Sequence, residues 1–426
     1  MSGVERVMLG GLWLAVATAL AGAGGMDRVW WAAAELVLFG VGLAALLGLP
    51  GRELVSLPWW PLPVVALVAA QWGLPPGAPV SVAPYETRYH LLSLVACLAG
   101  FYAAAWLAAR GESRRWLVGG LVGLGAFTAL YGLGKYLNVH SPAYDATGPY
   151  VNRNHFAGLL GMLLPLALAF AVARRSGREP VDEESLRWWL TRPEAQKVLL
   201  GLAAAALLFA ALLFSRSRMG LLSTLAALLL MGGLWVGSER GDRRRLAVVS
   251  LGAVLAGAAA LAVWIGIDPV VARFEAGGLG DTGRLPIWSD TLQLAGANLW
   301  LGTGWGTFAR AYPAVQTAHL GGFVIHAHND YLEHVVELGL PGALWLWAGI
   351  AGVYFRALRT FLGGVELRRR PWLWGAAGSL TAILLHSLAD FNLYIPANAL
   401  VFSLVLGMAY GLTRKDPEVV AAAEAA

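Results

Sequence analysis

One short stretch of the sequence holds most of the side chains that are suited to acid–base chemistry. Three histidines and three acidic residues fall close together: His326, His328, Asp330, Glu333, His334 and Glu337. A neutral imidazole accepts a proton from a hydroxyl group, and such help is typically worth about 10²–10⁴-fold in rate. An apolar run over residues 343–353 follows directly. Because ionisable groups beside a membrane span are costly to keep, we interpret this stretch as a functional site.

The spacing of the acidic residues predicts where a helix begins. Asp330 and Glu333 have the pattern of a capping box, so we expect Asp330 to be the N-cap. His328 and Asn329 then lie just before the helix, where unpaired N–H groups and the positive end of the dipole favour an anion. Residues 339–342 should break the helix, because Pro341 lacks a backbone donor and crowds the preceding turn.

Two further segments carry arginines that suit an anionic ligand. Arg216 and Arg218 lie in a short turn between two apolar stretches, and Arg153 stands in an Asn-Arg-Asn-His sequence. A guanidinium group binds phosphate through two parallel hydrogen bonds, so the turn suits a phosphate or pyrophosphate. Arginines at such places also reach lipid headgroups, and a polar run before an apolar stretch also caps helices. Both interpretations stay open.

Three other ionisable residues favour structural roles. Glu35 lies in an apolar stretch, where we expect it to bond to a neighbouring helix. His386 and Asp390 are four residues apart, which predicts a pair on one helix face that holds two helices together.

Two patterns resemble known sites without meeting their requirements. His326, His328 and Asp330 alternate as in some zinc hydrolases, but here they begin a membrane helix rather than part of a soluble layered fold. The glycine-rich run 302–306 is not followed by Lys-Ser/Thr, so it is not a nucleotide phosphate loop. The single cysteine, Cys97, forms no disulfide within the chain. We therefore expect no metal and no cofactor.

The composition requires a membrane to surround most of the chain. Hydrophobic residues make up 58% of the 426 residues and charged residues 13%, whereas a soluble chain carries about a quarter charged residues. A spanning helix needs roughly 20 mainly apolar residues. The candidate spans are 7–24, 29–49, 57–74, 91–109, 116–137, 155–173, 198–214, 219–237, 246–267, 340–358, 372–389 and 396–413. We therefore predict an all-α polytopic membrane protein with about twelve spans.

The lysines and arginines orient these spans. With the N-terminus in the cytoplasm, 22 of the 31 fall on the cytoplasmic side, as the positive-inside rule expects. Both termini are then cytoplasmic, and the net charge of +5 implies no nucleic acid partner. Nine cations remain on the opposite side: Arg28, Arg88, Lys135, Arg153, Arg216, Arg218, Arg273, Arg284 and Arg310.

The same topology predicts the domain organisation. It divides the chain into helices one to five (1–154), helices six to nine with the arginine turn (155–267), a long exoplasmic loop (268–339), helices ten to twelve (340–413) and a tail (414–426). The long loop should contain short helices over 284–298 and 305–313. A loop of this length is usually functional.

Three motifs together resemble one known family. His328-Asn329, nine residues and then Gly339-Leu340-Pro341-Gly342 resemble the signature of bacterial O-antigen ligases and polymerases. The turn from Ser215 to Arg218 is similar to that family's arginine-bearing turn, and Gly283-Arg284-Leu285-Pro286-Ile287-Trp288 is similar to its second arginine site. The first 150 residues match only in hydropathy.

The resemblance implies a reaction and a location. It implies an inner-membrane enzyme that transfers a glycan from undecaprenyl pyrophosphate to an acceptor hydroxyl, such as lipid A core, at the periplasmic face, without metal or nucleotide sugar. His328 becomes the candidate base, and Arg216 and Arg284 the pyrophosphate-binding pair. Arg218, Arg153, His326, Asn329 and Asp330 are candidate substrate-binding residues. His326 competes with His328 for the role of base, although the spacing to Gly339 favours His328.

Other functions stay open at this stage. The same signature fits an O-antigen or exopolysaccharide polymerase and a protein O-oligosaccharyltransferase. Anion or solute transporters also use arginines, but their sites usually lie near the membrane midplane. A structural subunit that docks a periplasmic partner is a further alternative. The sequence names neither the glycan nor the acceptor.

Overall fold

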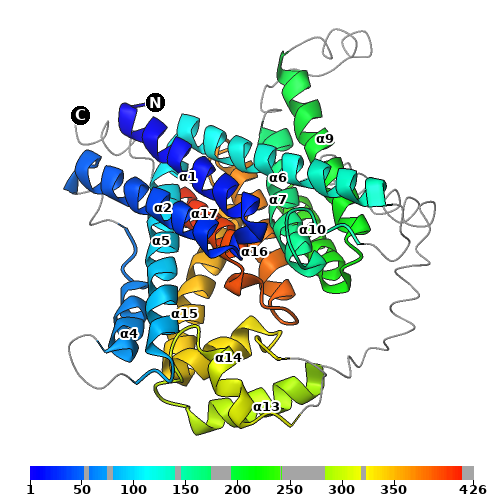
Figure 1. The fold of residues 1–426 in the computed structure, drawn as a ribbon. Helices are drawn as coiled ribbons and strands as arrows, with labels where there is room; N and C mark the ends of the chain where they lie inside the picture. Colours follow the sequence, from blue (N-terminus) through cyan, green and yellow to red (C-terminus); the bar gives the residue numbers. More distant parts are fainter. Residues whose placement is uncertain are drawn as a thin grey trace. The chain divides into compact units, whose positions relative to one another are not determined.

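Helices joined by loops make up the part of the chain that the computed structural model describes. These residues are 1–51, 57–73, 80–139, 145–173, 193–239, 241, 284–317 and 323–414. They form α-helices and short 3-10 helices, and no strand occurs among them (Figure 1). The predicted all-α class is therefore confirmed.

The helices follow the predicted spans closely. In chain order they are α1 (Gly3–Ala21), η1 (Ala23–Gly25), α2 (Arg28–Gly48), α4 (Leu62–Trp72), α5 (Pro84–Ala108), α6 (Gly111–Val139), α7 (Arg153–Ala173), α9 (Pro193–Phe214), α10 (Arg218–Ser238), α13 (Arg284–Ala297), α14 (Phe308–Ala311), η2 (Tyr312–Ala314), α15 (Asp330–Leu362), α16 (Arg370–His386), η3 (Asn392–Tyr394) and α17 (Pro396–Leu412). Every predicted span except 246–267 coincides with a helix, and that one lies outside the described residues.

Eight of the described helices are long and apolar enough to cross a membrane. They are α1, α2, α5, α6, α7, α9, α10 and α15. Helix α4 has 11 residues, and α16 and α17 have 17 each, fewer than the roughly 20 that a spanning helix needs. The chain is thus a membrane protein, while the number of twelve spans remains a prediction.

The described chain divides into two compact units, each built from separate segments. Unit 1 falls within Met1–Trp106, Gly277–Phe355 and Leu384–Gly407, and unit 2 within Leu107–Ala276, Arg356–Ile383 and Met408–Ala426. The histidine-rich stretch belongs to unit 1, whereas Arg153, Arg216 and Arg218 belong to unit 2. The domain boundaries drawn from the sequence are not tested by this division.

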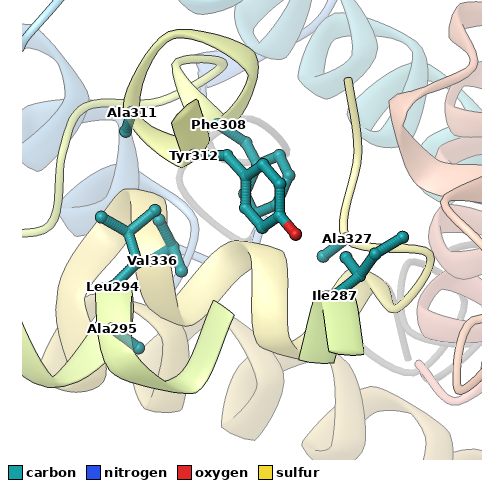
Figure 2. Close-up of a cluster of buried hydrophobic side chains, with 8 residues drawn as sticks. All are labelled: Ile287, Leu294, Ala295, Phe308, Ala311, Tyr312, Ala327 and Val336. Carbon is teal, nitrogen blue, oxygen red and sulfur yellow. The ribbon is translucent and has the colours of Figure 1, made fainter. Parts of the chain in front are cut away.

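In unit 1, the segment before α15 folds into short helices around its own apolar core. Figure 2 shows this cluster: Ile287, Leu294, Ala295, Phe308, Ala311, Tyr312, Ala327 and Val336. The hydroxyl of Tyr312 donates to Oδ2 of buried Asp290 (2.9 Å), and burial, with this bond and the nearby charge, raises the pKa of Tyr312. The predicted short helices correspond to α13 and to α14 with η2. The core joins them to the first turns of α15.

Helix α15 is broken at Gly339, within the predicted segment. Gly339 has φ 70° and ψ 166°, outside the helical region. A Cβ there would lie 2.4 Å from the carbonyl oxygen of Trp300, so only glycine fits. Pro341 lies inside the helix, two residues beyond the break. The break was predicted correctly, but the close approach of residues 300–302 accounts for its position.

Glu35 is bonded to a neighbouring helix, as predicted. Ser93 of α5 donates to its Oε1 (2.5 Å), and Nε1 of Trp31 donates to the Ser93 hydroxyl (2.8 Å). The acid therefore links α2 to α5 inside unit 1.

Candidate functional site

The helix that carries the site begins differently from the capping-box prediction. Oδ1 of Asn329, not of Asp330, accepts from the backbone N–H groups of Tyr331 (3.0 Å) and Leu332 (3.1 Å). Glu333 does not reach back to the backbone of Asp330, because its carboxylate binds His326 and the N–H of Ala327. Asn329 is therefore the cap, and the prediction for Asp330 is wrong.

The first turn of α15 keeps its donors within the chain. The N–H of Asp330 donates to the carbonyls of Ser387 (3.0 Å) and Asp390 (3.2 Å), and that of Glu333 to the carbonyl of Asn329 (3.0 Å). With Asn329 capping the next two donors, no N–H of this turn remains for an anion. The expectation of an anion site made by unpaired N–H groups is therefore wrong. The Asp330 side chain itself is fully buried.

His328 stands beside a buried carboxylate. Its Nδ1 lies 3.8 Å from Oδ1 of Asp390, whose side chain is 1% exposed, while the His328 side chain is 32% exposed. The backbone of His328 has φ 52°, in the left-handed region that favours glycine. This conformation costs a residue other than glycine about 1–3 kcal/mol. One ring nitrogen thus lies near a buried acid, and part of the side chain reaches the surface. Strain of this kind is typical of functional positions.

Asp390 also faces a second histidine. Its Oδ2 lies 3.7 Å from Nε2 of His386, which is buried. The two residues were predicted on one helix face, but α16 ends at His386 and Asp390 lies in the following loop. The prediction of a shared face is therefore wrong, although the two side chains lie close together. The loop is bound to α15 through the N–H of Asp330.

His326 has a different environment from His328. Its Nδ1 lies 2.6 Å from Oε1 of buried Glu333, and its ring stacks on Phe391 with centroids 4.1 Å apart. Burial lowers the pKa of His326 to about 4, against the opposing effect of the Glu337 and Asp390 charges. The imidazole is therefore neutral at neutral pH, and one ring nitrogen is occupied by the acid.

Aromatic rings continue from this stack into the unit. Trp305 stacks on His334 with centroids 5.0 Å apart and lies 6.1 Å from the ring of Tyr394. Tyr394 in turn lies 5.3 Å from the ring of His326. His334 is thus a buried core residue, and the aromatic packing fixes the backbone on both sides of His328.

Glu337 joins the glycine-rich run to α15. Its carboxylate accepts from the N–H groups of Gly306 (2.8 Å) and Phe308 (2.9 Å) and from the hydroxyl of Tyr394 (2.7 Å). Gln71 of α4 donates to the Glu337 carbonyl (2.7 Å) and accepts from the N–H of Trp305 (3.1 Å). Run 302–306 is therefore a packing element of unit 1.

Arg284 lies at the start of the helix that contacts the histidine-rich stretch. Helix α13 begins at Arg284, and Trp288, one turn later, donates through Nε1 to the carbonyl of Ala327 (2.9 Å). Residues four apart share a helix face, so Arg284 and Trp288 lie on the same side of α13. The structure therefore fixes the arginine-bearing helix directly to the residue that precedes His328.

In unit 2, two of the predicted arginines share one acid. Asp145 pairs with Nη1 of Arg153 and lies 3.6 Å from Nη1 of Arg216. Nη2 of Arg216 donates to the hydroxyl of Tyr136 (3.4 Å). Arg216 has φ 50°, and Arg218 is the first residue of α10, which Ser217 caps. The structure thus brings Arg153 and Arg216 together around a carboxylate.

Sequence reasoning missed the residues that support the site. Asp145, Gln71 and Tyr394 carried no prediction, and Asp390 was expected only to pair with His386. A buried glutamine in an apolar helix and a tyrosine in a short 3-10 helix have no distinctive local pattern. Asp145 had one signal, since it lies eight residues before Arg153 in the same loop.

Comparisons with known proteins agree with the motifs. Residues 203–346 match the family model described as O-Antigen ligase. The chain is also 28% identical over 292 residues to the exopolysaccharide production protein ExoQ of Rhizobium meliloti (strain 1021). That match covers 65% of this chain and 60% of the relative, so the chain spans less than two thirds of the relative's length. The two matches confirm the predicted resemblance to the superfamily of O-antigen ligases and polymerases.

Proposed function

We propose that the protein transfers a glycan from undecaprenyl pyrophosphate to an acceptor hydroxyl, as O-antigen ligases do, at the periplasmic face of a bacterial inner membrane. One observation carries the proposal: a partly exposed histidine, His328, has one ring nitrogen against the buried carboxylate of Asp390. The family model that covers residues 203–346 supports the reaction class. His328 is the base because Nδ1 of His326 is already hydrogen-bonded to Glu333.

The reaction exchanges one bond at the anomeric carbon of the donor sugar. The acceptor oxygen forms a bond to this carbon while the bond to the pyrophosphate oxygen breaks. The acceptor proton passes to Nε2 of His328, and the lipid pyrophosphate leaves with the bonding electron pair. Asp390 beside Nδ1 stabilises the imidazolium that forms and holds the ring in place. The proton later leaves with the lipid product or to water.

Arginines stabilise the charge that develops on the leaving group. Preorganised positive groups of this kind are usually the largest electrostatic contribution to catalysis. Arg284 is proposed for this role because α13 is bonded to Ala327 through Trp288. The family resemblance adds Arg216, and Arg153, Arg218, His326, Asn329 and Asp330 remain predicted substrate-binding or supporting residues. No metal or nucleotide sugar enters the proposed reaction.

A second candidate differs only in the acceptor. The matched relative is named for exopolysaccharide production, which favours chain extension by a polymerase. A ligase would transfer the glycan to lipid A core or a similar glycolipid, whereas a polymerase would transfer it to another lipid-linked repeat. The base and the leaving group are the same in both reactions.

Deletion of the gene followed by glycan profiling tests the proposal. Loss of lipopolysaccharide capping with accumulation of lipid-linked polymer supports ligation. Accumulation of single lipid-linked repeats supports polymerisation. Complementation with His328→Ala, at a wild-type level of membrane-inserted protein, should fail in either case. An unchanged glycan profile in the deletion strain, or full complementation by His328→Ala, would reject the proposed chemistry.

A further inference from the structure

Three segments that are far apart in the sequence meet at Glu86 in unit 1. Oε1 of Glu86 lies 3.8 Å from Nη2 of Arg310, and Oε2 lies 3.9 Å from Nη2 of Arg28. Arg28 begins α2, Glu86 is in the first turn of α5, and Arg310 is in α14. The proposed transfer reaction uses none of these three residues.

The two guanidinium groups are open to a further ligand. The Arg28 and Arg310 side chains are 64% and 69% exposed, although each faces the same carboxylate. Both distances are longer than a hydrogen bond, and neither side chain donates one to any residue that the structure describes. Arg28 also lies over the ring of Tyr89, 5.3 Å from its centroid. Glu86 and Tyr89 thus position the guanidinium groups, while the N–H donors of these groups remain available to a ligand.

The charges around Glu86 leave an excess of positive charge. Asp27 caps α2, because its Oδ1 accepts from the N–H groups of Val29 (3.0 Å) and Trp30 (3.4 Å). On α5, Arg88 lies over the ring of Tyr85, 5.5 Å from its centroid. The two remaining arginines, Arg28 and Arg310, therefore share the single carboxylate of Glu86. A single added anion would neutralise the group.

The cluster lies at the ends of apolar helices. Helices α2 and α5 are both long and apolar enough to span a membrane, and Arg28 and Glu86 are in their first turns. Groups at that height meet the headgroup layer of a bilayer. Guanidinium groups bind phosphate oxygens in pairs. We propose that Arg28 and Arg310 together bind the phosphate group of an anionic lipid headgroup, with Glu86 drawing the two cations to the same place.

The proposal is tested by binding, without any transfer reaction. The purified full-length chain in neutral detergent is titrated with dihexanoyl phosphatidic acid, inorganic phosphate and the neutral dihexanoylglycerol. The double variant Arg28→Gln/Arg310→Gln should lose about tenfold or more in affinity for the phosphatidic acid, because each lost charged hydrogen bond is worth about that factor. Glu86→Gln should bind it more tightly, because a competing carboxylate is removed.

Matched controls separate the possible outcomes. Arg6→Gln/Arg115→Gln removes two exposed arginines elsewhere and should leave the affinity unchanged. A loss for the phosphatidic acid alone identifies a lipid headgroup as the ligand, and an equal loss for inorganic phosphate identifies the phosphate group as the feature recognised. Equal binding of dihexanoylglycerol, or an equal loss in the control pair, would overturn the site. His328→Ala should bind normally, so failure of the transfer proposal is seen separately.

Discussion

Nδ1 of His328 lies 3.8 Å from Oδ1 of Asp390, and the acid is buried where the histidine is partly exposed. This geometry predicts that His328→Ala loses about 10²–10⁴-fold in transfer rate, the usual range for a general base. Transfer is measured in vitro with purified lipid-linked donor. The melting temperature in detergent should stay close to that of the wild type, because the His328 side chain is partly exposed.

Replacing the acid should weaken the base without unfolding the loop. Asp390→Asn keeps an oxygen that accepts from the N–H of Phe391 (2.9 Å) but removes the negative charge. We expect a fall in kcat of about tenfold or more with little change in KM. A kcat equal to that of the wild type would show that Asp390 only packs against its neighbours.

The pKa of His326 predicts how stability depends on pH. It is lowered to about 4 in the folded protein, below the ordinary value of 6.5, so the unfolded chain binds more protons between these values. The contribution of His326 to stability should therefore be fully present above about pH 6.5 and be lost as the pH decreases towards 4. Between pH 7.5 and pH 5 the loss is on the order of 2 kcal/mol.

The control for this prediction is His326→Gln. This variant lacks the titrating group, so its melting temperature should decrease less between pH 7.5 and pH 5 than that of the wild type. Parallel decreases in the two proteins would contradict a neutral His326.

A pair of glycines on one helix tests the break in α15. A Cβ at Gly339 would collide with the carbonyl of Trp300, and its φ of 70° is strained for alanine. Gly339→Ala should therefore destabilise the protein by about 1–3 kcal/mol or more. A Cβ at Gly352, further along α15, meets no atom within 4 Å, and Gly352→Ala should be neutral or stabilising by about 1 kcal/mol. Thermal unfolding in detergent compares the two.

Arginine chemistry, and not charge alone, should matter at the predicted pyrophosphate residues. Lysine keeps the charge but cannot make two parallel hydrogen bonds to a phosphate. We expect Arg284→Lys and Arg216→Lys each to lose about tenfold or more in kcat/KM. Arg88→Lys serves as the control and should retain wild-type activity. Full activity in Arg284→Lys would show that residue 284 contributes only its positive charge and not paired hydrogen bonds to the phosphate.

The parts of the fold that could be predicted from the sequence depend on the length of apolar runs and on helix-breaking residues. Apolar runs marked the helices, Gly339 marked a break, and Glu35 was expected to bond across helices. The helix start was missed by one residue, because Asn329 and Asp330 are both good caps and tertiary bonds from the Asp330 backbone decided between them. His328, which lies beside Asp390, and the partners of Glu337 (Gly306, Phe308 and Tyr394) come from segments far away in the sequence, which no local pattern encodes.

The attachment of Glu337 to run 302–306 has a consequence for protein engineering. Because Gln71 of α4 and Tyr394 bind the same cluster, the glycine-rich run cannot be grafted from a relative on its own. A chimaera that exchanges this run should also carry the donor's residues at positions 71, 337 and 394. An exchange confined to the run would place the backbone N–H groups of another protein beside the buried carboxylate of Glu337, without the other residues that position it.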